Sequence, residues 1–209
     1  MAKDKKKKKG DAPAENAVTG SLPSTLQEKY EQEIRAKVME KFGIKNVNAA
    51  PKLEKIVVNV GMGKQLENNK LPAHVKDTVL TTLSVVTGQK PILIKAKKSV
   101  SNFKVREGAE ASAMVTIRRD RMWHLLARVI HLACPRIKDF RGLPITSFDA
   151  AGNYSMGLPE QGVFPEIDMD QAQYTHGMHL NLVFRNSTPE ISRFVLEELG
   201  MPFQREDAA

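Results

Sequence analysis

The stretch that decides the fold is Lys55-Ile-Val-Val-Asn-Val60, which runs directly into Gly61-Met-Gly-Lys64. Its β-branched residues predict a central strand, and the two glycines predict a turn that ends it. Before this strand, apolar residues recur at every fourth position and predict a helix over residues 26–42, closed by Gly43. The strand therefore has an amphipathic helix to pack against.

After the strand, helical and strand patterns follow each other without a regular alternation. We expect three more helices, over residues 72–87, 120–133 and from Thr188-Pro189-Glu190 to Gly200, with Asp120 as a cap and Pro135 as a stop. We expect strands over residues 91–94, 111–118 and 179–185, with short strands and turns between 136 and 170. This order predicts an α+β fold, in which helices pack on one face of a mostly antiparallel sheet.

Composition narrows the class of protein. The chain has 209 residues, enough for the single compact domain that we place at residues 26–203. Its net charge of +8 favours a polyanionic partner, because each neutralised phosphate releases counterions. Cys134 is the sole cysteine, so no disulfide forms within the chain, and a reducing compartment is expected. There is neither a signal peptide nor a membrane-spanning run, so we expect a cytoplasmic protein.

The charge is unevenly distributed. Residues 1–25 hold six lysines and almost no large apolar side chains, and predict a disordered tail that serves as a nucleic-acid arm or only as a solubilising segment. Residues 88–141 carry a net charge of +9, whereas residues 142–184 carry −5 and contain no Lys or Arg. We expect residues 204–209 to form a loose acidic tail. Such polarity indicates two faces with different partners.

The strongest functional signal is the acid-free stretch of residues 88–106. Its basic residues are Lys90, Lys95, Lys97, Lys98, Lys104 and Arg106. Ser99 adds a neutral hydrogen-bonding group, and Phe103 offers a ring that can stack on a base. This composition predicts contact with RNA; the alternative is a mobile, exposed hairpin with Phe103 in the core.

Tests for catalytic or metal chemistry give little. Gly61 and Gly63 are one residue apart, so neither a Walker loop nor a dinucleotide fingerprint is present, and a turn whose backbone approaches a partner is expected instead. The histidines lack a third convergent ligand, so we predict no metal site. We also predict no nucleophilic role for Cys134. The alternating acids of residues 166–170 suit an acid–base pair, a solvated acidic edge or an interface for a basic partner, and we favour the two surface interpretations over catalysis.

Seven short motifs occur in one order along the chain: Lys55-Ile-Val-Val-Asn-Val-Gly-Met-Gly63, Gly88-Gln-Lys-Pro91, Lys95-Ala-Lys-Lys-Ser-Val100, Arg136-Ile-Lys-Asp-Phe-Arg-Gly142, Ser147-Phe-Asp149, Gly152-Asn-Tyr-Ser-Met-Gly157 and Phe164-Pro-Glu-Ile-Asp168. Together they resemble the bacterial large-subunit ribosomal protein L5 family. The resemblance covers residues 26–203.

The resemblance implies a structural ribosomal protein, not an enzyme, with an α+β sandwich fold and no cofactor. It implies binding to 5S rRNA in the central protuberance, beside large-subunit rRNA and neighbouring proteins. It also implies contact with the P-site tRNA and a bridge to a small-subunit head protein. Within that framework we assign Lys55, Asn59, Gly61, Gly63 and Lys64 to 5S rRNA. We assign Lys90, Lys95, Lys97, Lys98, Ser99 and Lys104 to tRNA, and Asp149, Glu160, Glu166, Asp168 and Asp170 to the bridge.

The chain departs from the family pattern in two places. Its Lys-rich N-terminal extension is longer than the family's usual start, so the role of the extension stays open. Lys97 stands where many members carry arginine, and lysine lacks the planar fork that binds phosphate through two hydrogen bonds. Two rival functions remain, a nucleotide- or metal-dependent hydrolase and a binding module for other RNAs. Identification of the co-purifying RNA separates these from a 5S rRNA-binding protein.

Overall fold

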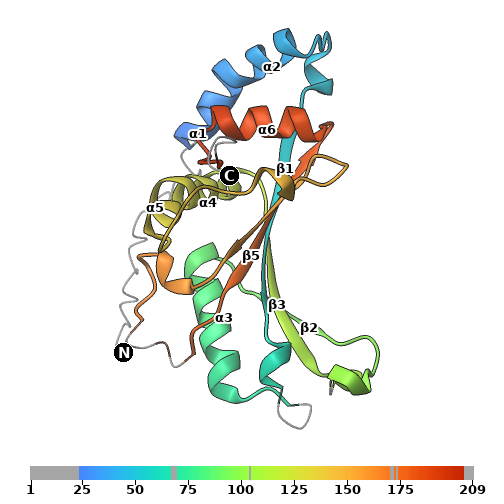
Figure 1. Cartoon of the computed structure of the whole chain (residues 1–209), viewed down its shortest axis with the longest axis vertical. Helices are drawn as coiled ribbons and strands as arrows, with labels where there is room; N and C mark the ends of the chain where they lie inside the picture. The colour runs from blue at the N-terminus through green and yellow to red at the C-terminus, as the bar shows by residue number, and fades with distance from the viewer. Residues whose placement is uncertain (1–23, 67–69, 104, 170–171, 173, 205–209) are drawn as a thin grey trace, which may run out of the picture.

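The computed structural model describes residues 24–66, 70–103, 105–169, 172 and 174–204 (Figure 1). Its described strands form one antiparallel sheet in the order β2-β3-β1-β5-β4. They are β1 (Lys52–Gly61), β2 (Ile92–Lys95), β3 (Glu110–Ile117), β4 (Tyr154–Leu158) and β5 (Met178–Arg185). The predicted α+β fold with an antiparallel sheet is confirmed, and the quoted stretch is its central strand.

Strand β1 owes its place to alternation. Leu53, Ile56, Val58 and Val60 are all buried, whereas the residues between them are partly or fully exposed. A strand that buries one face and pairs along both edges is fixed in register, because a slip of one residue would turn its apolar side chains to solvent. Strand β3 pairs along one edge and β5 along the other.

The first helical segment begins one residue before its predicted start and includes a wider turn. It comprises α1 (Thr25–Lys29), a π-helical turn at Tyr30–Ile34 and α2 (Arg35–Lys41). A spacing of four drifts by about 40° per step on an ordinary α-helix. The π-helical turn has more residues per turn and so helps keep the predicted stripe on one side. That stripe is buried at Leu26, Tyr30, Ile34 and Val38.

Ser24 belongs to the fold, since its side chain accepts a hydrogen bond from the Gln27 amide and caps α1. Residues 1–23, which make up most of the predicted tail, lie outside the described residues. Residues 205–209 of the predicted acidic tail lie outside them too, whereas the Gln204 amide donates to the Leu143 carbonyl at 2.9 Å. Helix α3 (Ala73–Thr87) ends as predicted at Gly88, whose φ of 63° suits glycine.

Two predicted helix boundaries were wrong. Pro135 does not stop the third helix, which runs as α4 (Asp120–Arg128), a π-helical turn at Val129–Ala133 and α5 (Cys134–Arg136). Proline removes one helical hydrogen bond and crowds the preceding turn, and the wider π-helical turn before it relieves that crowding. Asp120 is the first helical residue and not the cap, a place taken by Arg119. An acid in the first turn still interacts favourably with the helix dipole.

The last helix, α6 (Pro189–Glu198), begins after Thr188 as predicted, although the Thr188 side chain makes no capping hydrogen bond. A tight turn at residues 149–153 packs on this helix start. A Cβ added to Gly152, whose φ is 77°, would lie 2.9 Å from the Thr188 carbonyl group and the Ser192 hydroxyl. Only glycine fits there without a shift of the backbone.

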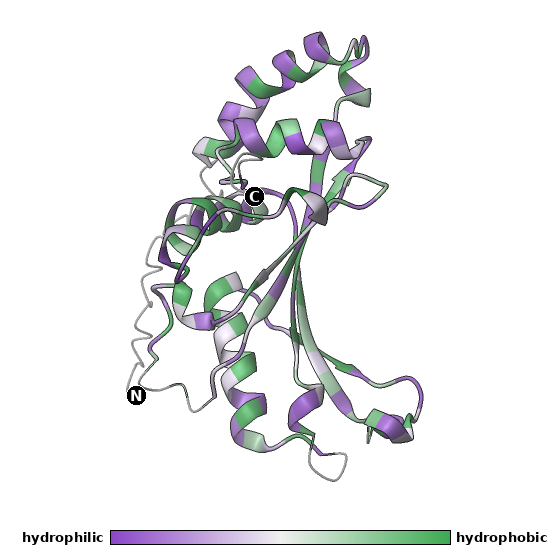
Figure 2. Cartoon of the chain, in the orientation of Figure 1, coloured by the Kyte–Doolittle hydropathy of each residue, from purple (hydrophilic) through white to green (hydrophobic). Residues whose placement is uncertain are grey.

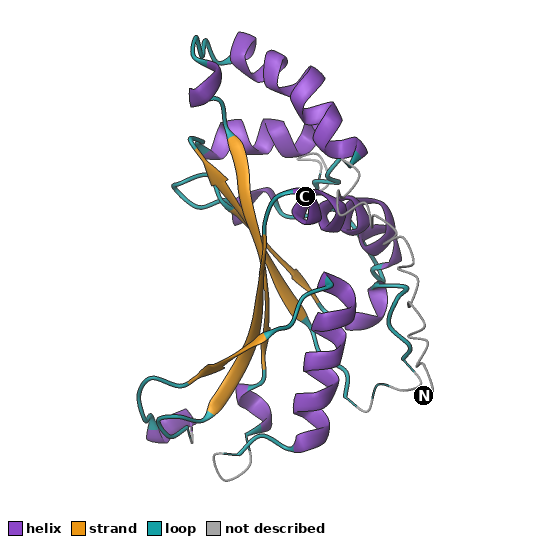
Figure 3. Cartoon of the chain, turned by 180° about the vertical axis from the view of Figure 1, so that it is seen from behind, coloured by secondary structure: helices purple, strands orange, loops and turns teal. Residues whose placement is uncertain are grey.

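The helices leave one face of the sheet uncovered. Helices α3, α4 and α5 lie on one side, and α1, α2 and α6 stand at one end, whereas no helix among the described residues lies on the opposite side (Figures 1 and 3). The buried side chains of the sheet and of all these helices form a single apolar cluster. Every helix in the described part of the chain is too short or too polar to span a bilayer.

Candidate nucleic-acid interface

The uncovered face of the sheet has no helix of the described chain packed against it (Figures 1 and 3). Its side chains come from alternate positions of the strands and are mostly small, polar or basic: Lys55, Val57, Asn59 and Gly61 of β1, Ser112, Met114 and Thr116 of β3, His179, Asn181, Val183 and Arg185 of β5, and Ser155 and Gly157 of β4. This set contains no acid, although the exposed Glu54 of β1 lies next to Lys55 at the β-bulge. Nearby, Glu110 ion-pairs with Lys76 of α3 at 2.7 Å. The face is therefore suited to a polyanion.

The two glycines after β1 have no structural role that explains them. Neither has a positive φ, and a Cβ added at Gly61 or Gly63 would meet nothing within 4 Å. The expected tight turn is thus not the reason for glycine at either position. Their backbone is exposed and unshielded by side chains, which leaves it open to the close approach of a partner.

The remaining residues assigned to 5S rRNA lie along the same strand and just after it. Lys55 and Asn59 are half-buried on the uncovered face, and Asn59 lies between Met114 of β3 and His179 of β5. Lys64 is exposed in the short 3-10 turn Gly63–Gln65 that follows β1. The structure therefore brings all five residues of this set onto one continuous strand and its exit turn.

The predicted basic loop is an ordered extension of the β2–β3 pair. The Ala96 amide donates to the Ala109 carbonyl at 2.8 Å, and Val100 and Val105 exchange hydrogen bonds of 2.9 and 3.2 Å. The Ser99 hydroxyl accepts from the Glu107 amide at 2.9 Å. These bonds order residues 95–103 and 105–109 as a projecting, largely hydrophilic loop, which we call the finger (Figure 2). The exposed residues of the tRNA set are Lys90, Lys95, Lys97, Lys98 and Ser99, whereas Lys104 lies outside the described residues.

Phe103 stands at the tip of this finger, in the 3-10 turn Ser101–Phe103. Its exposed fraction is 77 %, so the alternative that placed it in the core is wrong. A largely solvated phenylalanine amid lysines gains nothing from the fold, whereas a ring next to cations can stack on a nucleobase.

The acidic segment, residues 142–184, does not form a strand where its acids alternate. Residues 164–169 form turns and bends instead of a strand. Arg128 of α4 donates to Glu166 at 2.8 Å, and a second nitrogen of the same guanidinium donates to the Val86 carbonyl at 2.7 Å. Partial burial raises the pKa of Glu166, but the hydrogen bond from Arg128, a backbone hydrogen bond and the charges of Arg128 and Arg136 together outweigh it, so the pKa lies below its usual value. Glu166 is therefore ionised, and its charge is partly neutralised.

The other predicted bridge acids also differ in what they do. Asp149 accepts hydrogen bonds from the Asn153 side chain and from the backbone of Asn153 and Ala151, which lower its pKa. It therefore holds the turn at residues 149–153. Glu160 and Asp168 are exposed, and Asp170 lies outside the described residues.

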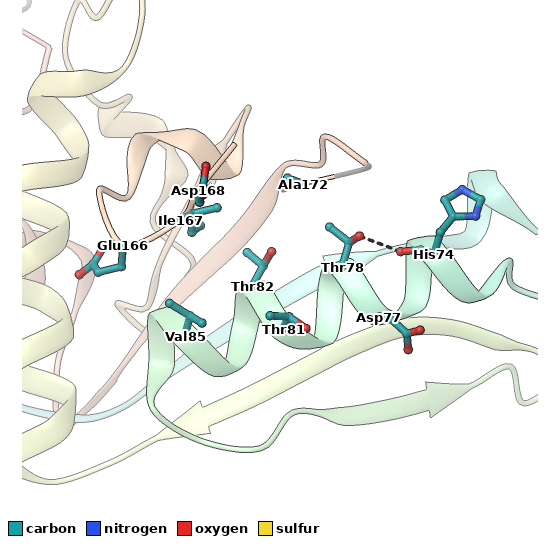
Figure 4. Close-up of a pocket in the computed structure, with 10 residues that line it drawn as sticks. All are labelled: His74, Asp77, Thr78, Thr81, Thr82, Val85, Glu166, Ile167, Asp168 and Ala172. Atoms are coloured by element: carbon teal, nitrogen blue, oxygen red, sulfur yellow. Dashed lines mark hydrogen bonds between the residues drawn. The ribbon is translucent and has the colours of Figure 1, made fainter. Parts of the chain in front are cut away.

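A pocket of about 430 Å³ lies between α3 and the acidic segment. Thr78, Thr81 and Thr82 of α3 face Ile167 and Asp168 across it (Figure 4). The Thr78 hydroxyl already donates to the His74 carbonyl at 2.7 Å. Hydroxyls and carboxylates without a paired nucleophile and base give no route to covalent catalysis.

Burial shifts the pKa of two further groups, Cys134 and His176. Cys134 is buried, and burial raises the pKa of its thiol to about 11, so it is not a thiolate near neutral pH. The described residues contain no cluster of three or more His, Cys, Asp or Glu that suits a metal ion. Burial lowers the pKa of His176, whose Nε2 lacks a hydrogen-bond partner.

Of the residues on the uncovered face, the sequence indicated only Lys55, Asn59 and Gly61, and it missed the polar residues of β5 and β4 beside them. His179, Asn181 and Arg185 alternate along β5, and Ser155 lies beside Asn181 on β4. The alternation of residues 179–185 could have indicated them, because the polar positions of a strand with one apolar face share the other face. Nothing in the sequence indicated that β5 would pair with β1 and so place these side chains beside Asn59.

Two family descriptions match the chain. "Ribosomal protein L5" covers residues 46–106, and the C-terminal part of the same ribosomal family covers residues 110–203. Similar proteins are named "Large ribosomal subunit protein uL5". That of Clostridium botulinum (strain Loch Maree / Type A3) is 48 % identical over 181 residues, 86 % of this chain and 98 % of that protein. That of Carboxydothermus hydrogenoformans is 46 % identical over 180 residues, again 86 % and 98 %.

Proposed function

Since the chain belongs to the ribosomal protein L5 family, a family of structural and non-catalytic proteins of the large ribosomal subunit, we propose that its uncovered sheet face binds 5S rRNA. Family membership also makes it an RNA-associated protein of the cytoplasm. Beyond this, the proposal gives it a defined task, which is to hold 5S rRNA against large-subunit rRNA and neighbouring proteins of the central protuberance.

The observation that carries this proposal is the open space above Gly61 and Gly63. Neither backbone conformation nor internal packing requires glycine there, yet the pair ends the central strand of a face rich in polar and basic side chains. A bare backbone lets a ribose–phosphate chain approach and accept hydrogen bonds from amide groups. Lys55 and Lys64, on either side of the glycines, supply charge for phosphates.

The finger between β2 and β3 forms a second RNA contact in this proposal, directed at the P-site tRNA. The lysines of the finger lie on a projection separate from the sheet, so the sheet does not depend on them for its stability. Hydrogen bonds across the finger hold it in one conformation before a partner binds. Lys95, Lys97 and Lys98 would contact phosphates, and Phe103 would contact a base. Preorganisation lowers the entropy lost on binding.

The acidic segment forms the third surface in this proposal, which faces a basic small-subunit head protein. Asp149, Glu160, Glu166 and Asp168 are all exposed, and we assign them to this bridge. Hydrogen bonds within the chain occupy carboxylate oxygens of Asp149 and Glu166, so these two contribute less than their exposure alone suggests. Long-range attraction between oppositely charged surfaces speeds association more than it tightens it.

Filter binding of the purified chain to 5S rRNA tests the main proposal. We expect tight binding whose logarithm falls linearly with the logarithm of salt concentration. Gly61→Leu should weaken binding by at least about ten-fold, because a side chain would keep RNA from the backbone. Gly88→Leu is unsuitable as a control, since Gly88 has a positive φ, whereas Ala36→Leu adds a comparable bulk at an exposed helix position.

Equal affinity of Gly61→Leu and Ala36→Leu would contradict the assignment of the glycines. A chain that binds unrelated structured RNA as tightly as 5S rRNA would instead be a general RNA-binding module. The thermal midpoint of each variant is measured as a control for folding. That of Gly61→Leu should stay unchanged, because the position is exposed and a Cβ there meets nothing within 4 Å.

A further inference from the structure

One row of paired residues crosses the whole sheet at the centre of its uncovered face. The strand register pairs Ile92 with Met114, Met114 with Asn59, Asn59 with His179, and His179 with Gly157. The row therefore contains two apolar side chains, one amide, one imidazole and one glycine. It contains neither a lysine nor an arginine.

The cations of this face lie toward its ends. Lys55 and Arg185 lie on one side of the row, and Lys64 and Lys95 lie beyond it on the other. Lys95 lies opposite Glu110, whose carboxylate already pairs with Lys76. A polyanion lying across the face would therefore find phosphate contacts at both ends and a neutral strip between them. Such a strip matches the part of a nucleic acid that carries no charge, which is the base.

His179 occupies this strip in an unusual way. Its side chain is exposed, and its Nδ1 and Cε1 lie 3.7 and 3.9 Å from the position that a Cβ on Gly157 would take. The ring thus lies beside the bare glycine position of the neighbouring strand, at van der Waals distance from the point where a side chain would begin. Glycine leaves this side of the ring open, because it has no side chain to extend beyond that point.

The neighbour of His179 can add specificity. Asn59 lies directly opposite it on β1 and is half-buried. An asparagine amide offers both donors and an acceptor, a combination that can pair with the edge of a base. Stacking surface and edge-recognising amide therefore stand side by side at the middle of the face.

We infer that His179, which lies between Gly157 and Asn59, is a stacking site for one unpaired base of the bound RNA. Sheet faces that bind single-stranded RNA elsewhere use aromatic side chains in the same role. This inference rests on the proposed function, because it names the recognition chemistry of the same face. A base held in the duplex cannot reach the site, so the ligand is a bulged or loop nucleotide.

The test compares His179→Ala with His74→Ala in filter binding to 5S rRNA. His74 is also an exposed histidine, but it lies on α3, on the helical side of the sheet. We expect about ten-fold weaker binding for His179→Ala and no change for His74→Ala. His179→Phe should keep most of the affinity, because it keeps a ring that stacks. Gly157→Val should weaken binding, because the branches beyond its Cβ would crowd the ring, which lies 3.7 Å from that Cβ position.

Chemical probing of the RNA completes the test. We expect one unpaired base to be protected by the wild-type chain and to become reactive with His179→Ala, while phosphate contacts at both ends persist. No binding by the wild-type chain would overturn the proposed function itself. Wild-type binding with equal affinities for His179→Ala and His74→Ala would overturn only the stacking site. Equal loss in His179→Phe and His179→Ala would overturn stacking as its chemistry.

Discussion

Arg128 and Glu166 join the most basic and the most acidic parts of the chain through a hydrogen-bonded ion pair of 2.8 Å. The same guanidinium donates to the Val86 carbonyl at the end of α3. One side chain thus fixes α4, the end of α3 and the acidic segment relative to one another. The basic and acidic parts of the sequence are therefore in direct contact in the folded chain, and their other charged surfaces are left for partners.

Replacement of Arg128 should cost more stability than replacement of another paired arginine. Arg128→Ala leaves a carbonyl and a carboxylate without their donor, and we expect a loss of about 1–3 kcal/mol in the free energy of unfolding. Arg193→Ala removes an ion pair to Glu197 four residues along a helix, and should cost about 0.3–0.5 kcal/mol. Urea denaturation of both variants measures the difference, and equal losses would contradict the linking role.

Replacement by alanine should destabilise the chain at Gly152 but not at Gly61. Gly152→Ala forces a Cβ to 2.9 Å from the Thr188 carbonyl at a positive φ, and should lower the free energy of unfolding by at least about 1–3 kcal/mol. Gly61→Ala meets open space at an ordinary φ and should leave the thermal midpoint nearly unchanged. Calorimetry on both variants decides. A large loss with Gly61→Ala would mean that the fold, and not a partner, requires that glycine.

His176 should make the chain less stable in mild acid. Burial lowers its pKa in the folded state, so below the ordinary histidine value of about 6.5 the unfolded chain binds more protons. Stability then falls as the pH drops below that value, until the folded pKa is passed. His176→Phe should flatten this part of the profile. Denaturation at about pH 7.5 and about pH 5.5, on either side of the ordinary value, checks it. An unchanged difference between the two pH values would refute the role of His176.

The finger should contribute to tRNA binding without contributing to folding. Changing Lys95, Lys97 and Lys98 to alanine should lower the salt dependence of P-site tRNA binding to reconstituted ribosomes, by about one in slope per lost phosphate contact. Phe103→Ala should weaken tRNA binding and leave the thermal midpoint unchanged, because the ring is 77 % exposed.

Alanine at the exposed Lys45 and Lys138 serves as the control for the loss of charge in the finger. These lysines lie outside the finger, so their replacement should leave the salt slope of tRNA binding as it is in the wild type. An unchanged slope in the triple variant would sink the tRNA assignment.

The bridge surface should act on subunit association alone. Glu160→Lys with Asp168→Lys reverses two exposed acids, and we expect slower and weaker joining of the subunits, measured by light scattering. Glu40→Lys reverses an exposed acid on α2 and should have no such effect. 5S rRNA binding should be normal in both, and its loss in the first variant would contradict the separation of the surfaces.

Much of the fold could be predicted because buried residues recur at regular intervals along the chain. Apolar residues at every fourth position from Leu26 predicted a helix, and alternation around Val58 predicted the central strand. The π-helical turn at Tyr30–Ile34 agrees with the apolar spacing of four, whereas the π-helical turn at Val129–Ala133 could not be predicted from the residue types. Pro135 misled for the same reason, because a wide turn before it lets the helix continue.

The candidate site was only partly predictable, because charge runs are local and sheet pairing is not. The lysines of the finger are close in sequence and were found together. His179 and Asn59 are neighbours solely through the pairing of β5 with β1, which no local pattern specifies. The ion pair between Arg128 and Glu166 was missed likewise, since it joins residues that the fold alone brings together.

The place of β1 also governs the order in which the chain can fold during synthesis. Its partner β5 joins Lys52 to Arg185, so one edge of the central strand waits until nearly the whole chain has left the ribosome that makes it. An unpaired, apolar strand edge is prone to join other chains, and distant pairing slows folding. Nascent copies of this protein therefore pass through a long interval in which the surface that later completes the sheet is open to aggregation and to chaperones.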